Sequence, residues 1–399
     1  MNDLTCIIIG GGHAGLGALK AIKETTRGMA NGRRIRFVLF DKQPGHVRKV
    51  LLFRPAVSEE EIMIPWTHYS NRNKFPDFEF VQGTVTSVDS GEKRIRYTDA
   101  QGNDARIRYD LLVVAVGSIV RRPDPAQGGI ALTDPQAAAD IRERWRANLR
   151  KAVGETNLEE RKRLLTVAVA GAGISGIETS AELALAIREE ASALGLNPSE
   201  ASVYLLNAQE RLFPGAPEKV GRKLELTLSE CGVTALHNRK AMREEAGVVT
   251  LSNGESLAVG QCIWTIGLIP NPVLRSMGLP LTPEGQVLVD ECYRVKGAPG
   301  VYSIGDCARI VDPRTGKADQ MRCGEGVLQA DRLGKIVMAD LEGRPAPVHK
   351  SVPMDFFCIG LGDNRGLVWG RKWGLNMIIT GKPAWKFRNL AWDAGSKLR

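Results

Sequence analysis

Residues 4–23 read LTCIIIGGGHAGLGALKAIK, and the order of residue types in this stretch decides the fold class. An apolar strand runs into the pattern Gly10-x-Gly12-x-x-Gly15, and a helix-like run of Ala, Leu and Ile follows. Gly10 permits a tight turn, Gly12 lets the backbone approach a pyrophosphate, and Gly15 allows the helix to pack closely on the strand. The N-terminus of the helix then faces the phosphate charge. The stretch therefore predicts the start of a dinucleotide-binding domain.

A second strand completes this unit. Residues 35–40 (IRFVLF) are apolar and end at Asp41, a carboxylate suited to accept a hydrogen bond from a ribose hydroxyl, and Lys42 beside it is a further candidate contact. The connection from Gly15 to Asp41 is longer than usual, so we expect an insertion. Strand, loop, helix, strand and acid in this order favour a bound dinucleotide over a purely structural glycine turn.

The same arrangement recurs later in the chain. Residues 164–187 read LLTVAVAGAGISGIETSAELALAI, with Gly171, Gly173 and Gly176 between an apolar strand and a helix, and VYLLN follows as a second strand. We therefore predict an α/β fold with two Rossmann-like dinucleotide-binding domains. Because hydride transfer needs two rings in one cleft, this pair indicates an oxidoreductase that uses a flavin and a nicotinamide. Two unrelated α/β domains are the alternative.

Two further apolar strands end in glycine. Residues 109–118 (YDLLVVAVGS) end near Gly117, and residues 300–308 (GVYSIGDCA) contain the pair Gly305-Asp306. Asp306, at a strand end and ahead of a helix, is suited to bind the ribityl chain or phosphate of a flavin. An isolated Gly-Asp pair would be a surface turn, but beside two glycine loops it favours a flavin site.

Together these motifs resemble those of the two-dinucleotide-binding flavoprotein superfamily. GGGHAG, YDLLVVAVGS, GAGISGIE, IWTIGLIPNP and GVYSIGDCA occur in the expected order over nearly the whole chain. Within the superfamily the chain resembles type II NADH:quinone oxidoreductases and, more closely, apoptosis-inducing-factor-like reductases typified by ferroptosis suppressor protein. The C-terminal stretches FFCIGLGDNRGLVWG and WKFRNLAWD resemble the final segment of that closer group. The resemblance implies an FAD domain at residues 1–150 and 285–345, an NAD(P)H domain at 151–284, and an α+β C-terminal segment at 346–399.

The resemblance also implies site residues. Gly10, Gly12 and Gly15 are expected on the FAD pyrophosphate, and Asp41 on the adenosine ribose. Val85 is expected at the adenine. The residues expected near the flavin ring are Arg54, Gly117 and Asp306. A surface position is an equal alternative for Arg54. Those expected around the nicotinamide cofactor are Gly171, Gly173, Gly176, Glu178 and Gly267. For Glu178 the alternative is a structural acid at a helix N-terminus.

Asn207 ends the second strand of the second unit, where a carboxylate usually binds the ribose of NADH. An amide can still hydrogen-bond the hydroxyls, but it carries no charge to repel a 2′-phosphate. Either NADH or NADPH is therefore admissible, with Arg211 as a candidate phosphate partner. Alternatively, Asn207 marks a site that has lost its cofactor.

The electron acceptor is predicted largely from what the motifs lack. No cysteine lies between Cys6 and Cys231, which excludes the disulfide relay of disulfide reductases. Cys323 and Cys358 are either flavin-facing thiols, as in sulfide:quinone oxidoreductases, or ordinary core residues. Type II NADH dehydrogenases carry a glutamine motif that lines their quinone site, and this chain retains at best Gln320 of it.

We therefore predict an FAD-dependent NAD(P)H oxidoreductase that reduces a quinone-like acceptor, with Glu178 and Gln320 orienting the rings. One alternative is a flavin-dependent oxidase or dehydrogenase of an organic metabolite with a degenerate nicotinamide site. The other is a redox-sensing flavoprotein. No metal site is expected.

The net charge of +9 is concentrated in residues 350–399, which also contain Trp369, Trp373, Trp385 and Trp392. This combination favours peripheral contact with an anionic membrane through the C-terminal tail, or a small core of its own. We expect no nucleic-acid partner, no signal peptide and no membrane-spanning segment, hence a cytoplasmic protein or a peripheral membrane protein. A homodimer is a further hypothesis.

Overall fold

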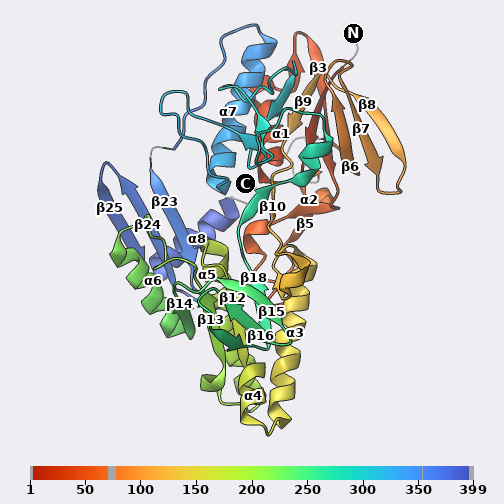
Figure 1. Cartoon of the computed structure of the whole chain (residues 1–399). Coiled ribbons are helices and arrows are strands. Elements are labelled where there is room, and N and C mark those ends of the chain that lie inside the picture. The colour runs from red at the N-terminus through yellow and green to blue at the C-terminus, as the bar shows by residue number, and fades with distance from the viewer. Residues whose placement is uncertain (1–2, 71–77, 353, 395–399) are drawn as a thin grey trace.

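The computed structural model describes residues 3–70, 78–352 and 354–394. Figure 1 shows a first domain, which contains the N-terminus, at the top of the view and a second domain at the bottom. A C-terminal segment lies beside the second domain, and its helix α8 (Lys382–Ala394) lies near the junction of the two domains.

The first domain is built on an eight-stranded sheet. Its strand order is β21-β9-β1-β3-β6-β7-β8, and β2 pairs with β3. The strands are β21 (Val301–Ser303), β9 (Leu111–Val114), β1 (Leu4–Ile9), β3 (Arg33–Asp41), β6 (Glu79–Asp89), β7 (Arg94–Asp99), β8 (Asp104–Arg108) and β2 (Met29–Ala30). The strands from β21 to β6 pair in parallel, whereas β6, β7 and β8 form an antiparallel meander.

The apolar run of β1 explains its central place in this sheet. Cys6, Ile7 and Ile8 have no exposed surface, and Cys6 is paired with Phe37 on one side and Leu111 on the other. A parallel strand covered on both faces reads as a continuous apolar run because neither face meets water. Each fully buried Ile contributes about 1.5–3 kcal/mol to stability.

Helices α1 (His13–Thr26) and α7 (Cys323–Leu341) pack closely against each other. Glycines permit this approach, since a Cβ on Gly17 would lie 2.9 Å from the Cβ of Ala330, and one on Gly334 would lie 2.6 Å from the carbonyl oxygen of Ala21. This packing brings the N-terminus of α7 to the glycine loop that precedes α1.

The second domain has a five-stranded sheet in which every pair is parallel, in the order β11-β18-β12-β13-β14. The strands are β11 (Ile130–Ala131), β18 (Gln261–Trp264), β12 (Thr166–Ala170), β13 (Ser202–Leu206) and β14 (Val233–Leu236), with a separate meander of β15 (Ala241–Glu245), β16 (Val248–Leu251) and β17 (Ser256–Ala258).

The helices of the second domain are α3 (Pro135–Gly154), α4 (Leu158–Leu164), α5 (Ile174–Ala193) and α6 (Glu218–Cys231). The start of α3 is fixed by Asp134, whose side chain accepts a hydrogen bond from the amide of Ala137, and by proline at the first helical position. Helix α6 ends at Gly232, which adopts the left-handed conformation that closes a helix.

Two short antiparallel strands, β10 (Ser118–Val120) and β19 (Leu268–Pro270), join the domains. Each follows directly on a glycine with positive φ, Gly117 at +65° and Gly267 at +94°. The side chain of Asn271 donates to the carbonyl oxygen of Val116 at 3.2 Å. The amide of Asn271 donates to the carbonyl oxygen of Gly117, and that of Arg121 donates to Gly267, so the two predicted ring-facing glycines lie at opposite ends of this strand pair.

The C-terminal segment is a meander of β23 (Asp355–Gly360), β24 (Gly366–Lys372) and β25 (Leu375–Thr380), followed by α8. Helix α8 packs on this meander, and β23 contacts α5 of the second domain. The remaining elements are β4 (Gly45–Val47), β5 (Met63–Pro65), α2 (Trp66–Ser70), β20 (Val287–Leu288), β22 (Ala308–Arg309) and short 3-10 turns at 49–51, 125–127, 198–200 and 272–276.

The predicted fold class is confirmed: two parallel α/β domains and an α+β terminal segment. Strands from residues 4–114 and 301–303 share the first sheet. Of the helices in the described part of the chain, none is long and apolar enough to cross a membrane.

Candidate functional site

The two glycine loops have the same construction. Gly10 and Gly171 both adopt positive φ, at +103° and +118°. A Cβ on Gly15 would lie 1.8 Å from the carbonyl oxygen of Gly10, and one on Gly176 would lie 1.8 Å from that of Gly171. Only glycine fits these positions, so each loop turns tightly from the carboxyl end of a strand into a helix N-terminus.

The middle glycine of each loop differs from the first and third glycines in having open space where a side chain would lie. A Cβ on Gly12 or Gly173 would meet no atom of the described residues within 4 Å. Both glycines immediately precede a helix, α1 and α5, whose first amides have no partner within the helix. The open backbone at these two positions fits the close approach of a pyrophosphate.

Asp41 ends β3 beside the first loop. Its carboxylate accepts hydrogen bonds from the amides of Gly11, at 2.6 Å, and Gln43, at 2.8 Å. Each carboxylate oxygen retains a further acceptor position for a ribose hydroxyl. Lys42 beside it is exposed. Val85 is buried in β6, three residues beyond the strand pairing with Asp41, so its predicted contact with an adenine stays a prediction.

Lys49 lies near Asp41, Asp306 and Cys323, and we call the space that these four residues border the flavin cleft. Lys49 and Cys323 keep exposed side chains, yet burial by the surrounding protein lowers the pKa of Lys49 and raises that of Cys323. The charges of Asp41 and Asp306 act against the pKa shift of Lys49, so this lysine lies close to both acids that the sequence assigned to FAD.

Asp306 is fixed at the other end of this cleft. Ser118 donates to its carboxylate at 2.6 Å, and Lys49 donates to the carbonyl oxygen of Ser118 at 3.2 Å. Burial raises the pKa of Asp306, while the hydrogen bond from Ser118 and the charge of Lys49 lower it. The pair Ser118 and Lys49 therefore holds the acid of the Gly-Asp motif.

A buried amide supports the Gly-Asp turn from behind. Gln329 of α7 accepts from the amide of Gly305 at 2.7 Å and donates to Asp319 at 2.7 Å. Gln320, the predicted glutamine, is instead exposed, and its carbonyl oxygen accepts from Arg322 at 2.5 Å. Its role in orienting a ring stays a prediction. Gln329 was not predicted from the sequence, although a glutamine within the apolar face of a predicted helix was a usable signal.

Asn207 is 5% exposed at the end of β13. Its side-chain nitrogen lies 2.9 Å from Nδ1 of His237, and its oxygen accepts from the amide of Gln209 at 3.2 Å. Arg211 donates to the carbonyl oxygens of Phe213 and Ala216 in its own loop, at 3.3 and 3.0 Å. The proposed phosphate partner is therefore occupied by the loop backbone.

Glu178 and Arg54 face the C-terminal segment. Glu178 is 2% exposed, and both of its oxygens accept from Arg388 of α8. Arg54 lies 3.8 Å from Glu182 and over the ring of Trp392. The predicted roles of Glu178 beside a nicotinamide and of Arg54 beside a flavin stay predictions. Cys358 is buried near Arg388, and all seven cysteines are free thiols.

Comparison with known proteins settles the family. The family described as pyridine nucleotide-disulphide oxidoreductase matches residues 4–332, which include both glycine loops, both junction strands and the Gly-Asp turn. The chain belongs to this family. Membership confirms that the chain is an oxidoreductase of the predicted superfamily, with FAD and a pyridine nucleotide as cofactors.

Relatives of this pyridine nucleotide-disulphide oxidoreductase align over most of its length. The oxidoreductase ptaL of Pestalotiopsis fici is 27% identical over 384 residues and covers 90% of each chain. The type II NADH:quinone oxidoreductase of Haemophilus influenzae is 24% identical over 373 residues, covering 85% of this chain and 81% of the relative. NDH2 from Plasmodium falciparum has the same fold, with a TM-score of 0.80 at 16% identity over 99% of this chain and 95% of that one.

His13 tests whether this chain fits FAD. It is the first residue of α1, and both of its ring nitrogens are buried without a hydrogen-bond partner among the described residues. Burial, together with the charge of His46, lowers its pKa to about 4, so the ring is neutral at neutral pH. A neutral imidazole offers one donor and one acceptor. An unpartnered ring at the helix that follows the first glycine loop fits a pyrophosphate ligand.

Replacing His13 by alanine should remove a loss of stability at acid pH from the FAD-free protein, but it should also weaken FAD binding. The folded-state pKa lies below the unfolded value of 6.5, so wild-type stability falls as pH drops from 6.5 towards 4. This loss, on the order of 3 kcal/mol, should be absent in His13→Ala. FAD affinity should fall about 5-fold, since one hydrogen bond contributes about 1 kcal/mol. Thermal unfolding across this pH range and FAD titration measure both. An acid profile identical to that of wild type would contradict the prediction.

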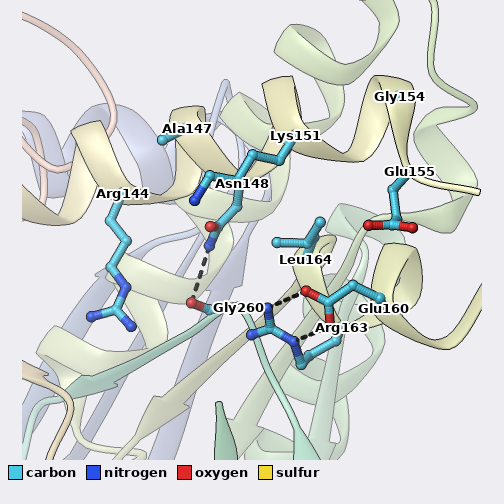
Figure 2. Close-up of a pocket in the computed structure, with 10 residues that line it drawn as sticks. All are labelled: Arg144, Ala147, Asn148, Lys151, Gly154, Glu155, Glu160, Arg163, Leu164 and Gly260. Carbon is cyan, nitrogen blue, oxygen red and sulfur yellow. Dashed lines mark hydrogen bonds and ion pairs between the residues drawn. The ribbon is translucent and has the colours of Figure 1, made fainter. Parts of the chain in front are cut away.

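A pocket of about 660 Å³ lies elsewhere in the second domain, as Figure 2 shows. It is lined by Arg144, Ala147, Asn148, Lys151, Gly154, Glu155, Glu160, Arg163, Leu164 and Gly260. Leu164 and Gly260 come just before β12 and β18, so the pocket lies at the amino ends of these strands. Dinucleotides bind at the carboxyl ends of parallel strands, which separates this pocket from the glycine loops.

Proposed function

We propose that the chain is an NADH-dependent flavoprotein oxidoreductase that passes two electrons to a quinone-like acceptor. The observation that carries the proposal is the presence of two equivalent glycine loops in domains joined by the pairing of β10 with β19. The names of relatives support the donor and the acceptor: the Haemophilus protein is a type II NADH:quinone oxidoreductase, and the Plasmodium protein has been solved in complex with NADH.

In this proposal the chain binds and orients, while FAD supplies the two-electron chemistry that links nicotinamide and acceptor. The residues that would hold FAD are Gly10, Gly12, Gly15, His13, Asp41, Lys49, Ser118 and Asp306. Those that would hold the nicotinamide cofactor are Gly171, Gly173, Gly176, Asn207 and Gly267. The positive charge of Lys49 would face the anionic parts of FAD, and Gly117 and Gly267, without side chains, leave room for the rings.

An anaerobic titration tests the proposal. The purified protein should be yellow, and its flavin absorbance should bleach with NADH and return on addition of a soluble quinone such as menadione. NADPH serves as the second donor. Failure to bleach with either donor would refute the proposal.

The metabolite oxidase remains the second candidate, because Asn207 is buried and already bonded to His237. It would be favoured by flavin that stays oxidised with both nucleotides but forms peroxide in air with an organic substrate.

The redox-sensing alternative and the homodimer share one test, which is light scattering of the oxidised and the dithionite-reduced protein. A reduction-dependent change in mass would favour the sensor, and a constant doubled mass would favour the dimer.

The variant Asn207→Glu should favour NADH over NADPH. A carboxylate at this position accepts from both ribose hydroxyls and repels a 2′-phosphate. We expect the ratio of kcat/KM for NADH to that for NADPH to rise by about 10-fold or more, which corresponds to about 1.4 kcal/mol. Arg211→Ala is the control, since its guanidinium binds its own loop, and the ratio should stay within twofold of wild type. An unchanged ratio in Asn207→Glu would place the ribose elsewhere.

Membrane contact, if it occurs, should use the β24–β25 hairpin. Of the tail tryptophans, Trp369 and Trp392 are 4% and 3% exposed and belong to the core. Trp373 and Leu375 are 88% and 76% exposed, and Lys372 lies 4.4 Å from the ring of Trp373. Apolar side chains beside basic ones fit the interface of an anionic bilayer.

The double variant Trp373→Ser, Leu375→Ser should bind vesicles of anionic phospholipid about 100-fold more weakly than wild type. Burying each apolar side chain contributes about 1.5–3 kcal/mol. Co-sedimentation with the vesicles measures the change. Leu158→Ser, at a residue of α4 that is 79% exposed, is the matched control and should bind normally. Equal binding of the double variant would remove the hairpin from the contact.

A further inference from the structure

Helix α5 of the second domain presents two carboxylates to the C-terminal segment. Glu178 and Glu182 are four residues apart and therefore lie on one face of the helix. Arg388 of α8 donates from Nε to Oε1 of Glu178 at 2.7 Å and from Nη2 to Oε2 at 2.9 Å. The amide of Gly360 adds a bond of 2.8 Å to Oε1. The side chains of Arg388 and Glu178 are 15% and 3% exposed, so this forked ion pair is buried.

The second carboxylate, Glu182, faces the segment 48–57, which follows the first strands of the first domain and packs on the second domain. Nη2 of Arg54 lies 3.8 Å from its Oε1. The guanidinium groups of Arg54 and Arg388 both lie over the ring of Trp392, at 5.4 and 5.0 Å from its centroid. Trp392 is 3% exposed and also contacts the ring of Phe53 at 5.4 Å. One indole of α8 therefore contacts both the arginine of this segment and the arginine that is paired with α5.

A third contact ties α8 to the first domain. Asp393 lies 2.9 Å from Arg48. The next residue, Lys49, donates to the backbone of Ser118, whose hydroxyl donates to Asp306. The segment 48–54 thus runs from the flavin cleft to α8, and displacement of one end would move the other.

We propose that α8 is an interdomain clamp, in which Arg388 and Trp392 act as positioning residues for hydride transfer. The inference rests on the proposed function. Arg388 and Trp392 join α5, which follows the nicotinamide loop, to the segment that carries Lys49 of the flavin cleft. Hydride transfer requires the two rings at near-contact distance, and a shift of about 1 Å can lower the rate about 100-fold. A clamp between the domains would fix this distance.

The chain supplies a matched control for Arg388. Arg371 of the same segment also pairs with a carboxylate, Asp355, at 2.6 Å, and lies over a tryptophan, Trp369, at 5.7 Å. That pair is within the C-terminal meander and exposed, so it joins no domains. Arg371→Met should therefore leave the distance between the rings unchanged.

Rapid mixing with NADH gives the first readout. Arg388→Met and Trp392→Leu should slow flavin bleaching by NADH about 100-fold. Reoxidation of the dithionite-reduced variants by ferricyanide should keep the wild-type rate, because that step does not depend on the second domain. The double variant Glu178→Gln, Arg388→Met should be no slower than either single variant, since each substitution removes the same ion pair between Glu178 and Arg388. Additive losses would show that Glu178 acts on the nicotinamide directly and would overturn the clamp.

Amide hydrogen exchange gives a readout that does not depend on activity. In Arg388→Met, exchange should accelerate both in residues 48–57, the segment that links the flavin cleft to α8, and in residues 177–187 of α5, whereas Arg371→Met should match wild type. Acceleration confined to α8 would overturn the proposal. If Arg388→Met does not fold, Asp393→Asn should show the same two-sided acceleration. If neither nucleotide reduces the flavin of the wild-type protein, the proposed function fails. The exchange pattern then still tests whether α8 holds the two domains together.

Discussion

Replacing Gly173 by valine should leave the protein yellow but remove its reduction by NADH, whereas the same replacement at Gly12 should remove the flavin. A Cβ at either position meets no described protein atom within 4 Å, so the side chain fits the polypeptide itself. Both residues have extended backbone, at φ −74° and −72°, which valine adopts readily. The added side chain instead occupies the approach of a pyrophosphate to the helix N-terminus.

The expected losses are large and separable. FAD affinity of Gly12→Val and kcat/KM for NADH of Gly173→Val should each fall at least about 100-fold, about 2.7 kcal/mol. Both variants should unfold within a few degrees of wild type, since replacing a glycine N-cap costs about 1 kcal/mol or less. Flavin content, stopped-flow bleaching and thermal unfolding measure the three properties. Reduction of Gly173→Val at the wild-type rate would show that the second loop holds no nucleotide.

Alanine at the third glycines provides the contrast. A Cβ on Gly15 or Gly176 would lie 1.8 Å from a carbonyl oxygen of its own loop, so these variants should fold poorly rather than lose one cofactor. A set of four variants thus separates positions that glycine holds for the ligand from positions that it holds for the fold.

Local patterns made this much of the protein predictable. The glycine loops, the acid after β3 and the two glycines before the junction strands are each defined by a few consecutive residues, and the structure places them at strand ends as the patterns require. The way in which the two domains join was harder to predict from the sequence. The pairing of β10 with β19 connects positions far apart in the sequence, and no local signal announces it.

The residues that complete the site were missed because tertiary packing assigns their roles. Gln329 reaches the Gly-Asp turn only because α7 packs on α1. Glu178 was predicted beside a nicotinamide from its distance to the second loop, but its partner Arg388 is 210 positions away. Lys49 lies in a basic and apolar stretch that resembles a surface turn, and its position between two acids depends on the fold of three segments.

Lys49→Met should weaken FAD binding about 10- to 100-fold, since a hydrogen bond from a charged group contributes about 1.5–3 kcal/mol. Lys49 is the cation that faces Asp41 and Asp306 along the cleft, and its pKa reflects both acids and its burial. Without it, the anionic cofactor would lose a favourable positive charge beside Asp41 and Asp306. Burial lowers the lysine pKa below its usual value, so wild-type FAD affinity should decline with rising pH earlier than an ordinary lysine would cause.

Lys42→Met is the matched control, because Lys42 also adjoins Asp41, whereas Lys49 is the lysine that donates to Ser118 beside Asp306. We expect it to bind FAD within about threefold of wild type, as removal of a surface charge costs about 0–1 kcal/mol. Equilibrium dialysis of FAD at several pH values distinguishes the variants: the alkaline decline should persist in Lys42→Met and be absent in Lys49→Met. Equal losses in the two variants would mean that the general positive field of this region, rather than Lys49 within the cleft, attracts the cofactor.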